Sequence, residues 1–80
     1  MNETDIRAVV TDVVASVLTL PAEEVSPRAR FYDDLGGDSL QKLEIVAHLE
    51  ARFTCSLTHE QVAVSDTVED FTRQVAQHVS

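Results

Sequence analysis

The chain is organised around one stretch, Phe31-Tyr32-Asp33-Asp34-Leu35-Gly36-Gly37-Asp38-Ser39-Leu40, and around the helix that is expected to follow it. Its two adjacent glycines allow the backbone to turn sharply. Asp38 has the position of a helix N-cap, because its carboxylate can accept the free amides of the next turn, and Gln41 can complete a capping box. The pattern therefore predicts a helix that begins at Ser39, with the serine hydroxyl on an exposed rim.

Hydrophobic spacing along the rest of the chain predicts an all-α fold, a four-helix bundle in which one helix is short. Apolar residues recur at intervals of three and four, and Pro21 prevents extension of the first helix. The predicted elements are a helix over about residues 4–19, a loop over 20–38, and helices over about 39–53, 59–64 and 67–79.

Capping patterns mark the starts of the last two helices. Thr58 and Thr67 each stand three residues before a side chain that can complete a capping box, Gln61 and Asp70 respectively. Asp66 competes with Thr67 for the start of the last helix, so two starts one residue apart remain open.

The apolar residues also predict the core of the bundle and the points at which the long loop is anchored to it. A loop of this length in a compact domain is usually functional or tied down. We expect Val25, Phe31 and Leu35 to pack it against the bundle, because isolated apolar residues in a polar loop otherwise gain nothing. The expected core residues are Ile6, Val9, Val13, Val17, Phe31, Ile45, Val46, Leu49, Phe53, Phe71 and Val75.

The helix over residues 39–53 carries a second apolar patch, away from its core stripe. A surface helix needs only one such stripe. The pattern leaves two interpretations open, a helix buried on two sides or a docking face beside Ser39. Lys42 is a misfit on the core side, and its stem is expected to lie on apolar surface with the ammonium in water. The residues of the second patch are Leu40, Leu43 and Ala47.

The motif Gly36-Gly37-Asp38-Ser39-Leu40, with Glu44 after it and an apolar helix that ends at Phe53, resembles the attachment motif of acyl and peptidyl carrier proteins. In that family the serine carries a 4′-phosphopantetheine arm donated by coenzyme A, and acyl groups are bound to the thiol of the arm as thioesters. The order of the helices extends the resemblance over nearly the whole chain. It implies that Ser39 bears the arm and that Asp38 fixes the helix start and presents it.

The resemblance also favours the docking interpretation of the second patch. Leu40, Leu43, Glu44 and Ala47 are then the contact face for partner enzymes. The implied partners are a phosphopantetheinyl transferase and synthase, acyltransferase or ligase enzymes. Fourteen acidic against six basic residues give a net charge of −8, which favours partners with basic docking patches. The same charge repels nucleic acid and anionic membrane surfaces, so we expect neither as a partner.

The remaining sequence features point to a reducing compartment. Cys55 is the single cysteine and cannot form an internal disulfide. The N-terminal segment is acidic and does not have the pattern of a signal peptide. No apolar run approaches the roughly 20 residues that span a bilayer. We expect a cytoplasmic, soluble monomer with one domain.

Catalytic and metal-binding interpretations are disfavoured. The letters Gly37-Asp38-Ser39-Leu40 also name a hydrolase family in which the serine is the nucleophile. That chemistry needs a base and an orienting acid, yet no strand is predicted before Ser39 and no Asp-x-x-His occurs in the chain. His48, His59 and His78 lack the short spacing of metal ligands. We therefore expect no catalytic residue and no metal site.

The resemblance thus implies a free-standing acyl carrier, not an enzyme. Asp38 ahead of the serine and the acidic surface favour fatty-acid or polyketide chains, whereas the double glycine fits the peptidyl carriers of non-ribosomal synthesis equally well. Lys42 departs from the neutral or acidic residues usual there in fatty-acid carriers, which favours polyketide or mixed specialised biosynthesis. The alternatives are a peptidyl carrier, a fatty-acid carrier, and a helical interaction module that carries no cargo.

Overall fold

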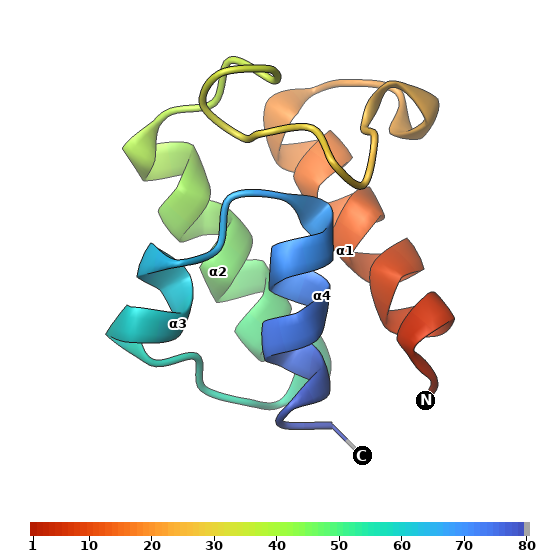
Figure 1. The fold of residues 1–80 in the computed structure, drawn as a ribbon, viewed down its shortest axis with the longest axis vertical. Coiled ribbons are helices and arrows are strands. Elements are labelled where there is room, and N and C mark those ends of the chain that lie inside the picture. The colour runs from red at the N-terminus through yellow and green to blue at the C-terminus, as the bar shows by residue number, and fades with distance from the viewer. Residues whose placement is uncertain (80) are drawn as a thin grey trace.

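In the computed structural model, which describes residues 1–79, the chain folds into four α-helices and one short 3₁₀ helix (Figure 1). No strand is present in this described part, and the all-α prediction is confirmed. In chain order the elements are α1 (Glu3–Leu18), η1 (Ala22–Glu24), α2 (Ser39–Phe53), α3 (His59–Ala63) and α4 (Val68–Ala76).

The three longer helices form a bundle that the long loop closes at one end (Figure 1). α1 packs against both α2 and α4 and runs in the opposite direction to them. The loop over residues 20–38 crosses the end at which α1 finishes and α2 and α4 begin, and the N-terminus lies at the other end. The starts of α2 and α4 are therefore brought to the same end of the molecule, next to the loop.

The core lies between α1, α2 and α4, and most of the predicted core residues are buried there. The exceptions are Val9, Val17 and Phe53, which are half-buried at its margin. Val10 and Val14 are buried instead, because α1 is flanked on two sides and buries a wider face than one stripe. The buried apolar residues are Ile6, Val10, Val13, Val14, Ala15, Val25, Phe31, Ile45, Val46, Leu49, Val68, Phe71 and Val75.

The helix boundaries follow the prediction except at the end of α4. This helix ends at Ala76, which corrects the predicted range of 67–79. After Ala76, the amides of Gln77 and His78 donate to carbonyls three residues back, at 3.3 and 2.9 Å. The chain therefore tightens into a last turn with three-residue spacing, after which the Val79 amide donates to the Val75 carbonyl, four residues back, at 3.2 Å. The other helix ends lie within one residue of the predicted ones.

The long loop is held to the bundle by its apolar side chains, as predicted. Val25 and Phe31 are only 4% and 1% exposed, and Leu35 is half-buried against the core. Burying a side chain of this kind typically contributes about 1.5–3 kcal/mol. The loop is thus part of the core and not a free linker.

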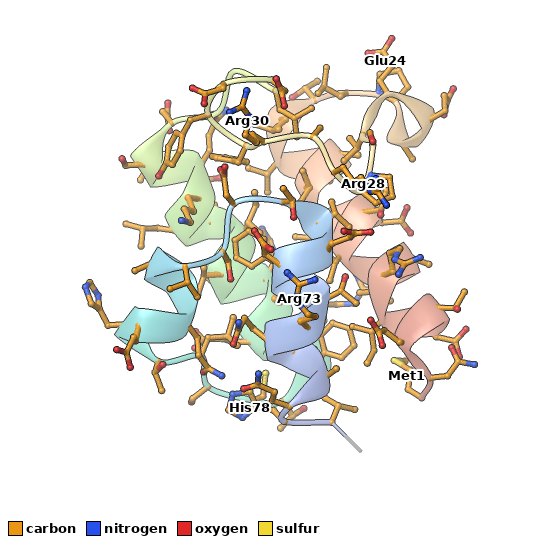
Figure 2. All side chains as sticks on the ribbon, in the orientation of Figure 1. Met1, Glu24, Arg28, Arg30, Arg73 and His78 are labelled. Carbon is orange, nitrogen blue, oxygen red and sulfur yellow. The ribbon has the colours of Figure 1, made fainter. Side chains whose placement is uncertain are left out.

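Hydrogen bonds tie the same loop to the start of α4. The amide of Phe31 donates to both the backbone carbonyl and the Oδ1 atom of Asp66, at 2.9 and 3.1 Å. The amide of Glu69, in the first turn of α4, donates to the carbonyl of Pro27 at 3.1 Å. Arg28, labelled in Figure 2, lies beside this point with its Nε atom 4.0 Å from the Glu69 carboxylate. The start of α4 therefore fixes the path of the loop towards α2.

Asp70 holds that start of α4 in place. Its carboxylate accepts the amides of Asp66 and Thr67 at 3.0 and 3.1 Å, and Arg73 donates to its other oxygen at 2.6 Å. Thr67 in turn accepts the amide of Asp70, so the capping box that Thr67 predicts is present. Partial burial raises the pKa of Asp70, but the amide hydrogen bonds outweigh it and bring the pKa below its ordinary value of 3.8.

We expect Asp70→Asn to destabilise the fold by about 1 kcal/mol at neutral pH, because the capping amides lose a charged acceptor. A carboxylate with a lowered folded-state pKa stabilises the fold fully above its unfolded pKa, and this contribution is lost as the pH falls through the folded pKa. The free energy of unfolding of the two proteins, measured by urea titration, should therefore differ constantly down to about pH 5 and converge below 3.8.

The exposed variant Asp12→Asn controls for the loss of one negative charge. A difference between wild type and Asp70→Asn that persisted unchanged at pH 3 would show that the Asp70 carboxylate does not stabilise the start of α4.

Candidate functional site

The loop before α2 contains a turn that Arg30 and Asp34 close reciprocally. The Arg30 amide donates to Asp34 Oδ2 at 2.7 Å, and the Asp34 amide donates to the Arg30 carbonyl at 2.9 Å. The Arg30 guanidinium, which lies on the loop in Figure 2, is 3.5 Å from the carboxylates of both Asp33 and Asp34. The Arg30 amide, aided by the guanidinium charge, lowers the pKa of Asp34. This turn sets the direction in which the chain approaches the two glycines.

Gly36 and Gly37 serve different purposes. Gly36 has a φ of +71°, the left-handed region that favours glycine, and the space around it is open. Gly37 has no such φ, but a Cβ atom added there would overlap the ring of Phe31. The Gly37 amide also donates to the Phe31 carbonyl at 3.0 Å. The backbone can therefore pass directly over the buried ring only because Gly37 has no side chain.

Asp38 caps α2 through the capping box expected from the sequence. Its Oδ1 atom accepts the amide of Gln41 at 2.8 Å, and the Gln41 side chain accepts the amide of Asp38 at 3.0 Å. Ser39 is consequently the first residue of the helix. Because Asp38 performs the capping, the hydroxyl of Ser39 is not needed for it.

Ser39 is exposed, and its hydroxyl forms no hydrogen bond within residues 1–79. A nucleophilic serine requires a base in hydrogen-bonding contact, and the described residues supply none to Ser39. The hydroxyl is instead accessible to a second protein, at a helix N-terminus where backbone amides and the helix dipole favour a phosphate.

The second apolar patch of α2 is exposed to solvent. Leu40 and Leu43 are 67% and 61% exposed, and Glu44 and Ala47 are exposed beside them. These four residues, the α2 outer face, lie three and four positions apart and so share one side of the helix. The interpretation of α2 as a helix buried on two sides is therefore wrong.

The sequence pattern indicates no role for Tyr32. Its ring is 44% exposed and lies edge-on to Phe31, with 5.3 Å between the ring centroids. The ammonium of Lys42 lies 5.6 Å from the centre of the Tyr32 ring, and the lysine side chain is half-buried. The ammonium, expected to lie in water, thus faces an aromatic ring. The available signal was the pairing of an aromatic loop residue with a lysine in the first turn of the next helix.

Other features of the described residues give no competing site. A hollow of about 250 Å³ between α1 and α2 is lined mostly by polar side chains, Asp12, Ser16, His48 and Arg52, with Val13 and Val17. Such a lining suits an acyl chain poorly. Within residues 1–79 no cluster of three or more metal-ligating side chains is found. No helix in this part of the chain has both the length and the apolar character needed to cross a membrane.

Comparison with known proteins identifies the family. The model of the phosphopantetheine attachment site family matches residues 8–75. The chain belongs to this family of carrier proteins. It is 33% identical over 69 residues to an acyl carrier protein of Chlorobium luteolum, across 86% of this chain and 88% of that protein. It is 36% identical over 70 residues to an acyl carrier protein of Thermosynechococcus vestitus, across 88% of this chain and 86% of that protein.

Family membership is consistent with an exposed hydroxyl that has no catalytic base beside it. Acyl carrier proteins are carriers and not catalysts, and their prosthetic group is 4′-phosphopantetheine. When bound, this group supplies a thiol that holds acyl groups as thioesters. The residues at the start of α2 fit it, because Ser39 offers an exposed hydroxyl without a hydrogen bond in the described structure, and the helix N-terminus favours the phosphate.

The two glycines allow a matched test of how the site is positioned. We expect Gly37→Ala to cost about 1–3 kcal/mol, because the new methyl group must displace the Phe31 ring. Gly36→Asn should cost less than about 1 kcal/mol, because asparagine tolerates the left-handed region and the space there is open. Urea denaturation of both variants measures the difference. Equal losses would contradict the close approach of Gly37 to Phe31.

Proposed function

We propose that Ser39 is the attachment site of the 4′-phosphopantetheine arm and that acyl intermediates are carried on this arm. The observation that carries the proposal is the exposed Ser39 hydroxyl at the first position of a helix already capped by Asp38. Asp38 then has a positioning role, because its capping box fixes the direction of the first helical turn and so of Ser39.

In the loading reaction the partner enzyme supplies the catalytic groups. A phosphopantetheinyl transferase binds coenzyme A and removes the proton from the Ser39 hydroxyl. The Ser39 oxygen forms a bond to the phosphorus next to pantetheine, the phosphoanhydride bond of coenzyme A breaks, and 3′,5′-ADP leaves. The chain itself has only to present the hydroxyl, which agrees with the absence of a hydrogen-bonded base at Ser39 in residues 1–79.

We further propose that the α2 outer face docks the transferase and the enzymes that load and use the acyl group. Leu40 and Leu43 expose apolar surface within one or two turns of Ser39, and Glu44 adds a negative charge. An exposed apolar patch with charge beside it is typical of an interaction site. With a net charge of −8, the chain suits synthase, acyltransferase or ligase partners with basic docking patches.

For the pathway, we propose polyketide or mixed specialised biosynthesis and a free-standing carrier. Lys42 in the first turn of α2 supports this choice over a primary fatty-acid carrier. The names of the relatives, which are acyl carrier proteins, support acyl cargo over the aminoacyl cargo of a peptidyl carrier. The single cysteine, Cys55, supports a reducing, cytoplasmic setting.

The attachment site is tested by the mass of the intact protein after incubation with coenzyme A and a broad-range transferase. Wild type should gain the mass of one phosphopantetheine group, and Ser39→Ala should gain none. The free energy of unfolding should change by less than about 0.5 kcal/mol, because the exposed hydroxyl has no hydrogen bond in the described structure. Ser56→Ala, at another exposed serine, should load normally, and loading of Ser39→Ala would refute the assignment.

The docking role of the α2 outer face is tested at Leu43. Because this side chain is 61% exposed, Leu43→Ala should cost no more than about 0.5 kcal/mol of stability, yet reduce the kcat/KM of loading. Leu49→Ala is the matched control, since Leu49 is fully buried and its truncation should cost about 2–5 kcal/mol. Glu44→Lys should slow association with the transferase, and more so at low salt.

If Leu43→Ala lowered the free energy of unfolding by several kcal/mol, Leu43 would be a core residue and not a docking residue. Unchanged kcat/KM in both Leu43→Ala and Glu44→Lys would show that the transferase docks elsewhere.

A further inference from the structure

Lys42 differs from the other basic residues whose partners the structure shows. Arg28, Arg30 and Arg73 are each paired with a carboxylate. The ammonium of Lys42 forms no such ion pair within residues 1–79 and instead lies over the ring of Tyr32, 5.6 Å from its centre. In a chain with fourteen acidic residues, a lysine held at an aromatic ring keeps its charge available for another anion.

The position of Lys42 places this charge beside Ser39. The two residues are the first and fourth of α2, and residues three apart on a helix are surface neighbours with Cβ atoms about 5–6 Å apart. Tyr32 belongs to the loop that leads into the helix, and it is braced edge-on against the buried ring of Phe31. The ammonium is therefore held on the loop side of the helix start.

The carboxylate one helical turn before Lys42 does not pair with its ammonium. Asp38 precedes Lys42 by one helical turn, but its Oδ1 atom accepts the amide of Gln41, and no ion pair with Lys42 forms in the described structure. A phosphodiester on Ser39 would add one negative charge next to Asp38. Lys42 is then the cation placed to offset that charge, since Arg52, the other basic residue of α2, lies about 20 Å farther along the helix axis than Ser39.

We propose that Lys42 pairs with the phosphodiester of the arm, an inference that rests on the proposed attachment at Ser39. A phosphate oxygen is a stronger partner for an ammonium than a half-exposed tyrosine ring, because the hydrogen bond joins two opposite charges. Loading therefore moves the ammonium from Tyr32 to the phosphodiester. Lys42 is a positioning residue, which fixes the base of the arm on the loop side of α2.

The first measurement compares the thermal unfolding of unloaded and loaded protein, for wild type and for each variant. Loading should raise the Tm of wild type by about 3 °C more than it raises the Tm of Lys42→Gln. Lys42→Arg should retain the gain because it keeps the positive charge. Arg52→Gln removes an equal charge far from Ser39 and should also retain it. In 1 M salt the difference between wild type and Lys42→Gln should shrink, as expected for a partly exposed charge pair.

The second measurement follows the Tyr32 ring by NMR in the wild-type chain. On loading, its ring resonances should move towards those of unloaded Lys42→Gln, in which no ammonium lies over the ring. Lys42→Gln serves here only as the reference for a ring without an ammonium, and the movement of Lys42 is followed in the wild-type chain.

The intact mass of every sample shows whether Ser39 is loaded, and so separates the test of attachment at Ser39 from the test of Lys42. If wild type fails to load, or loads at another serine, the proposed function is refuted. If wild type and Lys42→Gln both load at Ser39 but show equal gains in Tm, or if the Tyr32 resonances do not move, attachment at Ser39 stands and the role of Lys42 is overturned.

Discussion

The packing of the Phe31 ring against the backbone at Gly37 is the contact on which the rest of the site depends. The ring is 1% exposed and lies where a Cβ atom of residue 37 would be. The Phe31 carbonyl accepts the Gly37 amide, and the Phe31 amide donates to Asp66. One residue of the loop is thus fixed through its amide, its carbonyl and its side chain. The next residues, Asp38 and Ser39, begin α2 from a fixed position and not from the end of a flexible linker.

This arrangement links two helix starts that are distant in sequence. Asp66 and Asp70 organise the start of α4, and Asp66 also receives the amide of Phe31. A change at the start of α4 therefore reaches the start of α2 through one buried aromatic residue. The helices form a rigid support. The buried contacts hold the loop in place, so the exposed residues of the α2 outer face next to Ser39 are not needed for the stability of the fold.

The sequence predicts those features that local interactions determine. The capping boxes at Asp38 and Thr67 join residues three apart, so a short pattern specifies them, and the start of α2 follows directly. The burial of Val10 depends on helices packing on two sides of α1, which no local pattern encodes. The contact of Phe31 with Gly37 and that of Lys42 with Tyr32 require the path of the loop. The sequence supplied the residues of both contacts but not their pairing.

The helix starts differ in the charge of their first turns. α1, α3 and α4 each carry an acidic residue in the first turn, where carboxylates favourably oppose the helix dipole. α2 carries none there, although the chain has fourteen acidic residues, and its capping box uses the neutral Gln41 with Lys42 next to it. A carboxylate in that turn would stabilise the helix but repel a phosphate. With attachment at Ser39, the helix whose first turn holds no acidic side chain beyond its Asp38 cap is the one that receives a phosphodiester, so an omission that costs some helix stability serves the prosthetic group.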